Sequence, residues 1–369
     1  MKFVLTGGGT AGHINPALAL AEILQECDHE VFFAGTPQGV EARLVGQTDI
    51  PFVALEASGF DRERPHTLVT SSLKILRSAR KAKAWMCEVR PDAVVGFGGY
   101  VSIPVGMAAE QLNVPVVVHE QNSVMGMANK FLGKKAAAVA LTYEVAGKDI
   151  ADASKLIVTG NPVRSSVLSA TREQGREMLG IPQDATMLLV FGGSLGARHI
   201  NAAISSLKKQ LLAIDGLYVV HITGPKEYEA TCAELAFTDE EASRWTVMPY
   251  QDRMAETLRA ADCTISRAGA TSLAEISALG LPALLVPFPY AAEDHQTTNA
   301  RAYVERGAAE MMADSELDSE EFANKVLALV TDADLRNRMR AAAATFETEN
   351  AAAKLADVVV DAAMRGALR

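Results

Sequence analysis

Short apolar runs alternate with longer amphipathic stretches along the whole chain of 369 residues. The runs are rich in Val, Leu and Ile and show little two-residue alternation, which is typical of strands covered on both faces. They are KFVLT, EVFFAG, FVAL, DAVVGF, VPVVVHE and AAAVAL in the first half, and TMLLVFGG, LYVVHITG, WTVMP, CTIS and PALLVPF in the second. Strands that alternate with helices indicate parallel sheets with helices on both sides. We therefore predict an α/β protein with two doubly wound domains, of about six or seven strands and about six strands.

The pattern is interrupted near GNPVRSSV, where Gly160, Asn161 and Pro162 favour a break. We expect an N-terminal domain over residues 1–162 and a C-terminal domain over 163–345. Residues 346–369 are expected to form a terminal helix that packs back on the N-terminal domain. No apolar run approaches the ~20 residues of a membrane-spanning helix.

Three segments share one pattern, in which a strand is followed by glycines and then by a helix. They are VLTGGGTAGH, VVGFGGYVS and LVFGGSLGAR. Glycine lets a ligand approach the backbone closely, and a helix N-terminus presents amides and partial positive charge to an anion. Because ligands bind beyond the carboxyl ends of strands in open parallel sheets, the three loops predict a phosphate-bearing ligand in a cleft between the domains.

The loops do not fit the common nucleotide motifs. GGGTAG matches GxGxxG, but the next strand, VFFAGT, lacks the acidic residue that a dinucleotide site uses on the ribose. His13 and Ile14 stand where a phosphate-loop ATPase has its lysine and hydroxyl. A better ribose-binding candidate is Glu275 in SRAGATSLAEISALG, about one turn into a helix that starts near Thr271. The alternative is that Glu275 is a solvated acid that favours the helix dipole.

His13 is the candidate catalytic residue of the first loop. HINP predicts Asn15 as a helix cap and Pro16 at the first helical position, so that His13 lies just before the helix N-terminus. The positive end of the dipole favours the neutral imidazole, the form that acts as a general base. The alternatives for His13 are a hydrogen bond to a phosphate and a purely structural role. His119 and Glu120 in VVVHEQN are rival bases.

Charge and cysteine content narrow the function further. The net charge of −10 argues against a nucleic-acid-binding protein. The four cysteines are far apart without a CxxC pair, and we interpret them as buried thiols in a reducing cytoplasm. The one DxD-like string, at Asp332 and Asp334, is interpreted as a helix cap, so neither a metal nor a cofactor is expected.

A basic stretch stands out against the acidic whole. From Arg62 to Arg90 there are eight basic and two acidic residues, interspersed with apolar side chains in TLVTSSLKILRSARKAKAWMCEV. A basic amphipathic segment can lie on an anionic membrane surface. The alternative is a surface helix whose apolar face packs on the sheet.

The motifs GGGTAGH, GFGGYVS, HEQN, GNPVR, FGGSLGA, RAGATSLAE and PFPYAAEDHQTTNA occur in the order seen in MurG-type bacterial glycosyltransferases. This resemblance covers essentially the whole chain. It implies a GT-B fold, in which two Rossmann-like domains face a cleft. It also implies UDP-N-acetylglucosamine (UDP-GlcNAc) as donor and lipid I, undecaprenyl-pyrophosphoryl-MurNAc-pentapeptide, as acceptor. GlcNAc would be transferred with inversion to the 4-hydroxyl of MurNAc, giving lipid II for peptidoglycan synthesis.

The resemblance also implies roles for residues at matching positions. The N-terminal domain would face the acceptor and the membrane, and the C-terminal domain would bind UDP-GlcNAc. His13 would deprotonate or orient the 4-hydroxyl, and Gly98, Gly99 and Tyr100 would lie in acceptor loops. The substrate-binding residues would be Thr10, Ala11, Gly12, Asn122, Arg164, Ser194, Gln251, Ala270, Thr271, Ser272, Leu273, Ala274, Glu275 and Gln296. Two positions depart from some relatives, which have glutamine where His295 and Leu195 stand.

The acceptor's lipid tail implies that the protein is peripheral on the cytoplasmic face of the cell membrane, with the stretch from Arg62 to Arg90 as the contact. Cell-wall assembly proteins are further partners that the resemblance implies. Other functions stay open at this point: a related glycosyltransferase with a diacylglycerol acceptor, a UDP-GlcNAc 2-epimerase, or a nucleotide-sugar-binding module without catalysis. HEQN and GNPVR together favour the lipid I enzyme, whereas an epimerase would turn over UDP-GlcNAc with no acceptor.

Overall fold

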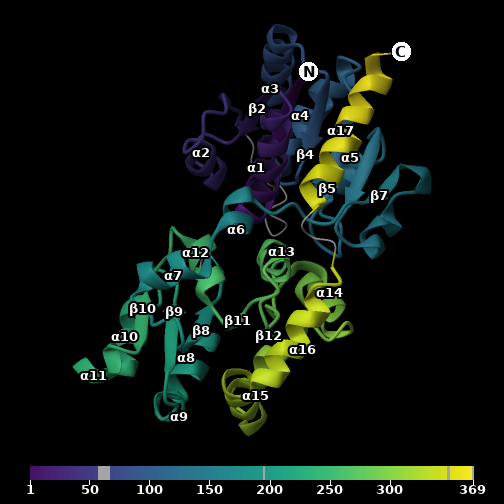
Figure 1. The fold of residues 1–369 in the computed structure, drawn as a ribbon. Coiled ribbons are helices and arrows are strands. Elements are labelled where there is room, and N and C mark those ends of the chain that lie inside the picture. Colours follow the sequence, from purple (N-terminus) through teal and green to yellow (C-terminus); the bar gives the residue numbers. More distant parts are fainter. Residues whose placement is uncertain (57–66, 194–195, 347–349, 368–369) are drawn as a thin grey trace. The chain divides into compact units, whose positions relative to one another are not determined.

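The chain folds into two compact α/β units, which Figure 1 shows in a computed structural model that describes residues 1–56, 67–193, 196–346 and 350–367. The first unit comprises described residues of 1–164 together with 350–367, and the second comprises those of 165–346. Each unit contains one parallel sheet with helices on both faces. This confirms the predicted fold class.

The sheet of the first unit has the strand order β3-β2-β1-β4-β5-β6-β7. Its strands are β1 (Lys2–Thr6), β2 (Glu30–Gly35), β3 (Phe52–Ala54), β4 (Ala93–Gly96), β5 (Val116–Glu120), β6 (Ala138–Leu141) and β7 (Leu156–Val158). Its helices are α1 (Ala11–Glu26), α2 (Val40–Val45), α3 (Thr67–Val89), α4 (Ser102–Gln111), α5 (Met127–Gly133) and α17 (Ala351–Ala367), with short 3-10 turns at Glu144–Asp149 and Ala153–Lys155.

Both faces of this sheet are buried, as the continuous apolar strands predict. Phe3 and Leu5 of β1 belong to a core formed with α1 and α17, whereas Val4 between them belongs to the opposite core formed with α3, α4 and α5. Helix α17, the last helix of the described residues, thus packs on the sheet that contains β1 (Figure 1).

The sheet of the second unit has the order β10-β9-β8-β11-β12-β13. Its strands are β8 (Thr186–Phe191), β9 (Leu217–Ile222), β10 (Trp245–Met248), β11 (Cys263–Ser266), β12 (Ala283–Leu285) and β13 (Ala309–Met311). Its helices are α6 (Ser165–Ser169), α7 (Arg172–Leu179), α8 (Arg198–Ser206), α9 (Lys208–Leu212), α10 (Tyr228–Leu235), α11 (Asp239–Ala242), α12 (Met254–Ala260), α13 (Ala270–Ala278), α14 (His295–Val304), α15 (Glu320–Thr331) and α16 (Ala333–Ala343), with 3-10 turns at Ala292–Asp294 and Asp314–Glu316.

Several further expectations can be compared with the structure. Asp332 caps α16 by accepting a hydrogen bond from the amide of Leu335 at 2.9 Å, which confirms its interpretation as a cap. The prediction of buried thiols is wrong for Cys27 and Cys87, which are exposed. Within the described parts of the chain, every helix is too short or too polar to cross a membrane.

Candidate functional site

Two glycine loops of the first unit lie against each other at the carboxyl ends of β1 and β4, which are neighbours in the sheet. The amide of Gly8 donates a hydrogen bond to the carbonyl of Gly98 at 3.3 Å. Gly99 has a φ of +80°, and a Cβ there would lie 2.5 Å from the carbonyl oxygen of Gly8. Glycine is therefore required at this position by both the backbone conformation and the close approach.

Helix α1 starts at Ala11 with Thr10 as its N-cap. The prediction that Asn15 caps the helix and Pro16 opens it is therefore wrong. Pro16 is the sixth helical residue, so its missing N–H removes the backbone hydrogen bond to the carbonyl four residues earlier. Since the helix begins earlier, His13 lies within its first turn and its ring folds back over the glycine loop.

The ring of His13 has a defined tautomer. Its Nδ1 lies 2.7 Å from the carbonyl oxygen of Gly8, and because a carbonyl only accepts, Nδ1 must carry the proton. In the neutral ring Nε2 then has the free lone pair. A Cβ placed on Gly98 would lie 3.1 Å from this Nε2 and 3.2 Å from Cδ2, so this edge of the ring borders the Gly98–Gly99 loop.

Glu41 of α2 supports the same loop from beneath, and the sequence analysis did not identify it. Its carboxylate is completely buried and accepts hydrogen bonds from the amide of Gly9 at 3.3 Å and from the amide and hydroxyl of Thr36 at 3.0 and 2.5 Å. A Cβ on Gly8 would lie 2.6 Å from this carboxylate. Nothing in VEARLV distinguishes Glu41 from an ordinary first-turn acid, so the signal is purely three-dimensional.

The structure gives the rival bases His119 and Glu120 structural partners. His119 is completely buried, donates from Nε2 to the carbonyl of Gly160 at 3.0 Å and accepts at Nδ1 from Gln121 at 3.1 Å. Burial lowers the pKa of His119 to about 4.

The carboxylate of Glu120 accepts from the amides of Asn122 and Gly126, at 3.0 and 2.9 Å, and from the side chain of Asn129 at 2.8 Å. Both candidates therefore shape the loop after β5, and the same bonds hold Asn122 in that loop.

The remaining candidates of the first unit surround the two glycine loops or follow β7. Thr10 is exposed, whereas Ala11 and Gly12 are half-buried, and Tyr100 is exposed beside Gly99. Arg164 follows β7, and its Nε donates to Glu22 of α1 at 2.9 Å. The structure thus places these residues at or near the carboxyl edge of one sheet.

The glycine loop of the second unit follows β8, and Ser194 and Leu195 in it lie outside the described residues. Gly193 and Gly196 on either side have φ values of +88° and +80°. Helix α8 follows, so its N-terminal amides are at the carboxyl edge of this sheet.

Helix α13 begins after β11 at the same edge, with Gly269 as N-cap and Ala270 as first residue. Leu273 and Ala274 are buried against the core, whereas Thr271 and Ser272 are half-buried. The side chain of Glu275 is half-buried as well, and burial raises the pKa of its carboxyl to about 7. Glu275 is therefore not a fully solvated acid.

Gln296 connects the loops after β11 and β12. Its Oε1 accepts from the amides of Ala268 and Phe288, at 3.1 and 2.9 Å, so both bonds leave its NH2 group to donate elsewhere. Gln251 lies in the loop after β10, where its Oε1 accepts from the amide of Arg253 at 3.0 Å.

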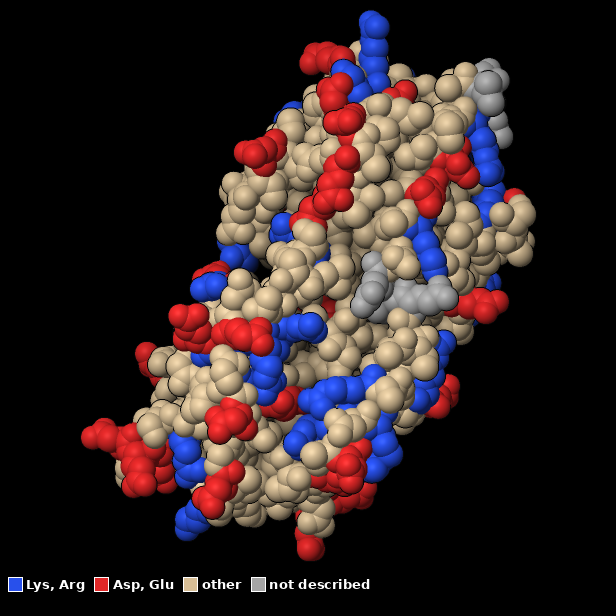
Figure 2. Space-filling model, viewed as in Figure 1, with Lys and Arg blue, Asp and Glu red and all other residues tan. Residues whose placement is uncertain are grey.

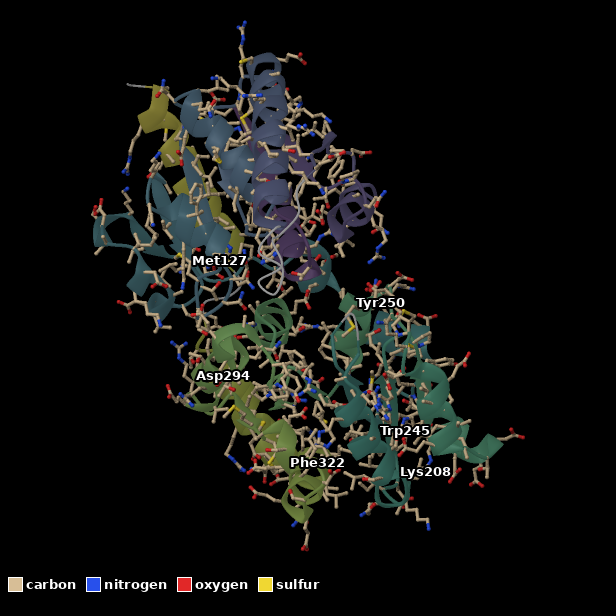
Figure 3. The ribbon with its side chains drawn as sticks, turned by 180° about the vertical axis from the view of Figure 1, so that it is seen from behind. Met127, Lys208, Trp245, Tyr250, Asp294 and Phe322 are labelled. Atoms are coloured by element: carbon tan, nitrogen blue, oxygen red, sulfur yellow. The ribbon has the colours of Figure 1, made fainter. Side chains whose placement is uncertain are left out.

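The loops of the second unit that carry these candidates share one edge of its sheet. Figure 3 shows Tyr250 and Asp294, which belong to the loops after β10 and β12, at the same end of the second unit, whereas the core residues Trp245 and Phe322 lie further along it. Among the described residues, no group of three or more His, Cys, Asp or Glu side chains is placed to hold a metal ion.

Comparison with known proteins gives a consistent result. Residues 3–141 match the Glycosyltransferase family 28 N-terminal domain, and residues 187–356 match the Glycosyltransferase family 28 C-terminal domain.

Curated relatives match over nearly their full length. The chain is 37% identical to the UDP-N-acetylglucosamine–N-acetylmuramyl-(pentapeptide) pyrophosphoryl-undecaprenol N-acetylglucosamine transferase of Bacillus subtilis, over 97% of this chain and 99% of that protein. The protein of the same name from Desulforamulus reducens is 41% identical over 87% of each chain.

Solved structures agree on the fold. The crystal structure of MurG from Acinetobacter baumannii is 30% identical, with a TM-score of 0.74 over 98% of this chain and 99% of that chain. A UDP-N-acetylglucosamine 2-epimerase has a TM-score of 0.70 over 100% of this chain and 96% of that one, but at 15% identity it shows a shared fold alone.

Proposed function

The chain belongs to glycosyltransferase family 28, and from this premise we propose that it transfers GlcNAc from UDP-GlcNAc to the 4-hydroxyl of MurNAc in lipid I, giving lipid II. The observation that carries the proposal is the 37% identity over nearly the whole chain to the Bacillus subtilis transferase of that name. The product is formed with inversion, when the acceptor oxygen bonds to C1 of GlcNAc and the bond from C1 to the UDP oxygen breaks.

His13 is the general base in this proposal. The hydrogen bond from its Nδ1 to the carbonyl of Gly8 leaves Nε2 free to take the proton of the 4-hydroxyl. Since Nε2 faces Gly98, the acceptor sugar binds along the Gly98–Gly99 loop. The carbonyl oxygen of Gly8 accepts a hydrogen bond from Nδ1–H before and after the proton transfer to Nε2. It therefore also stabilises the imidazolium that forms.

The leaving diphosphate needs hydrogen-bond donors and positive charge. The N-termini of α8 and α13 in the second unit supply backbone amides aligned with the helix dipoles. In this proposal Glu275 accepts from the ribose hydroxyls, and the free NH2 of Gln296 donates to a hydroxyl of the sugar. The second unit thus binds the donor, and the first unit binds the acceptor.

Helix α3 is the membrane-facing element of the proposal. Ala82 and Met86 are buried in the core that includes the sheet, and Ala79 is buried as well. One face of the helix therefore packs on the protein, as the alternative interpretation expected. Leu73 and Leu76 nevertheless stay 52% and 49% exposed. Exposed cations on the same helix are Lys74, Arg77 and Arg80. Exposed apolar and basic side chains together favour peripheral binding to an anionic cytoplasmic membrane surface.

The proposal is tested by transfer of labelled GlcNAc from UDP-GlcNAc to a short-chain lipid I analogue, in the presence of a chelator. We expect product, and we expect His13→Ala to lower kcat by about 10²–10⁴-fold, as loss of a general base does. His29→Ala is the matched control, since His29 lies before β2 at the other edge of the same sheet.

Three results would contradict parts of the proposal. Turnover of UDP-GlcNAc without acceptor would favour the epimerase, and transfer to diacylglycerol but not to the lipid I analogue would favour the other glycolipid enzyme. Near-wild-type turnover of the His13→Ala variant would exclude His13 as the base.

A further inference from the structure

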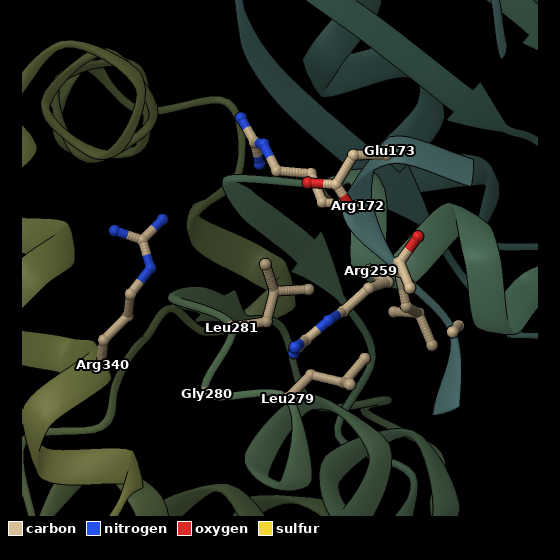
Figure 4. A pocket seen from close by; sticks show the side chains of 11 residues that line it. Arg172, Glu173, Arg259, Leu279, Gly280, Leu281 and Arg340 are labelled. Atoms are coloured by element: carbon tan, nitrogen blue, oxygen red, sulfur yellow. The ribbon is translucent and has the colours of Figure 1, made fainter. Parts of the chain in front are cut away.

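A pocket of about 490 Å³ lies in the second unit, among α7, α12, α13 and α16. Its lining includes three arginines from three helices, Arg172, Arg259 and Arg340, and the apolar side chains of Leu258 and Leu281. Figure 4 shows the three guanidinium groups on different sides of the hollow, with Leu281 between them. On the face shown in Figure 2, Lys and Arg side chains gather between α12 and α16.

The pocket lies away from the candidate donor-binding loops. Ala261 in its lining is two residues before β11, and Leu281 is two residues before β12. These positions are at the amino ends of parallel strands, whereas the candidate donor residues follow the carboxyl ends of the same sheet. A ligand in the pocket therefore does not occupy the proposed UDP-GlcNAc site.

The charges around the pocket are not balanced. Asp262 beneath the lining forms ion pairs with Arg172 and Arg176, at 3.0 and 2.7 Å, and lies 3.9 Å from Arg340. Glu173 is the one carboxylate in the lining. The three lining arginines and Arg176 carry four positive charges, and Asp262 and Glu173 carry two negative charges. The difference is an excess of two positive charges.

The arginines differ in how far they are already engaged. Arg172 donates to the carbonyl of Ala260 at 3.3 Å, and Arg340 donates to the carbonyl of Asp262 at 3.1 Å, so both also satisfy backbone groups. Burial lowers the pKa of Arg340, which means that its charge is under-solvated. Arg259 is exposed and makes no hydrogen bond or ion pair with any part of the chain that the structure describes.

We propose that this pocket is a second anion-binding site, which takes a small organic anion carrying one or two phosphate groups. Guanidinium groups bind phosphate oxygens through paired, charge-assisted hydrogen bonds, and the three in the lining outnumber the carboxylates beside them, Glu173 and Asp262. The volume lies within the range of small-molecule sites, roughly 300–1,000 Å³. The leucine side chains supply an apolar wall for the organic part of the ligand.

The site also contacts both ends of the segment that carries Glu275. Leu279 and Gly280 in the lining follow the last residue of α13, and Ala261 in the lining precedes β11, which leads into the N-terminus of α13. An anion bound here therefore holds the β11–α13 segment from the end opposite to the donor.

The test is equilibrium dialysis of the full chain with labelled inorganic pyrophosphate, with and without UDP to identify the donor site. We expect two pyrophosphate sites, one of them displaced by UDP, and binding to the other that weakens with salt. Arg259→Gln should weaken that second site by about tenfold or more, and leave the UDP-displaced site unchanged. Arg340→Gln should act in the same direction.

Arg338→Gln is the matched control, because Arg338 is an exposed arginine of α16 outside the pocket lining. Since Arg259 has no partner in the described chain, its replacement keeps the fold, even if loss of Arg340 disturbs it. A single pyrophosphate site that Arg259→Gln does not affect would overturn the proposal. So would two sites that respond equally to Arg259→Gln and Arg338→Gln.

Discussion

Replacement of Glu41 by glutamine should impair catalysis although Glu41 contacts neither substrate in the proposal. Each carboxylate oxygen of Glu41 faces hydrogen-bond donors, the amide of Gly9 on one side and the amide and hydroxyl of Thr36 on the other. Glutamine offers one oxygen and one NH2 group, so at least one backbone amide would face another donor. The glycine loop can relieve this repulsion only by moving.

The size of the effect follows from these contacts. A hydrogen bond to a charged acceptor contributes about 1.5–3 kcal/mol, so Glu41→Gln should lower the free energy of unfolding by about 1–3 kcal/mol. The carbonyl of Gly8, which adjoins Gly9, fixes the ring of His13. Because a displacement of about 1 Å costs roughly 10²-fold in rate, we expect kcat to fall by about 10–100-fold.

The assay compares kcat for transfer to the lipid I analogue with unfolding in urea. Glu30→Gln is the control, because it removes the same charge from an exposed glutamate. If Glu41 acts through His13, then adding Glu41→Gln to His13→Ala should change kcat little beyond His13→Ala alone. Full additivity of the two losses, or a kcat within about twofold of wild type for Glu41→Gln, would refute the reasoning.

Three further predictions test the loops, the donor site and the membrane surface. Gly98→Ala should lower kcat, because its Cβ would lie 3.1 Å from Nε2 of His13 at a φ of +102°. The control, Gly216→Ala, has a φ of +70° in open space, so it should lower only the free energy of unfolding in urea. The Kd for UDP-GlcNAc should fall as pH rises through about 7, where Glu275 ionises and accepts from the ribose, and this dependence should vanish in Glu275→Gln. The pH dependence of stability runs the other way. Because the native carboxyl of Glu275 holds its proton more tightly than the unfolded one, the free energy of unfolding falls as pH rises from about 4.5 to about 7. Leu76→Glu should weaken sedimentation with phosphatidylglycerol vesicles, and binding that neither salt nor this change affects would contradict the membrane role.

The strands that could be predicted are those with a long apolar run. The described residues form sheets of seven and six strands, which agrees with the expected six or seven and about six. The two strands absent from the predicted runs, β7 and β13, have three residues each and lie at sheet edges. An edge strand is paired on one side only and needs less apolar sequence, as the partly exposed Ile157 and Val158 of β7 illustrate.

The start of α1 could not be read from local preferences. Asn15 and Pro16 form a good helix-start signal, yet the helix begins at Ala11. The bonds that fix the preceding loop come from Gly98 and Glu41, which are distant in sequence. Tertiary contacts therefore override the local signal. The role of Glu41 depends on the same contacts, so no local sequence motif indicates it.

The two histidines at strand ends show why residue type alone cannot assign a base. His13 and His119 both stand near the carboxyl edge of the first sheet and both donate to a backbone carbonyl. In His119 the second nitrogen, Nδ1, accepts a hydrogen bond from Gln121, and the ring is completely buried. A proton taken up by Nδ1 would therefore face the NH2 group of Gln121 and would have no contact with solvent. In His13 the second nitrogen faces Gly98, where the absence of a side chain leaves room for an acceptor hydroxyl. The difference depends on what the second nitrogen meets, which the fold decides. It follows that Gln121→Ala, which frees Nδ1 of His119, should not restore activity to His13→Ala, and any rescue of kcat in the double variant would return His119 to consideration as the base.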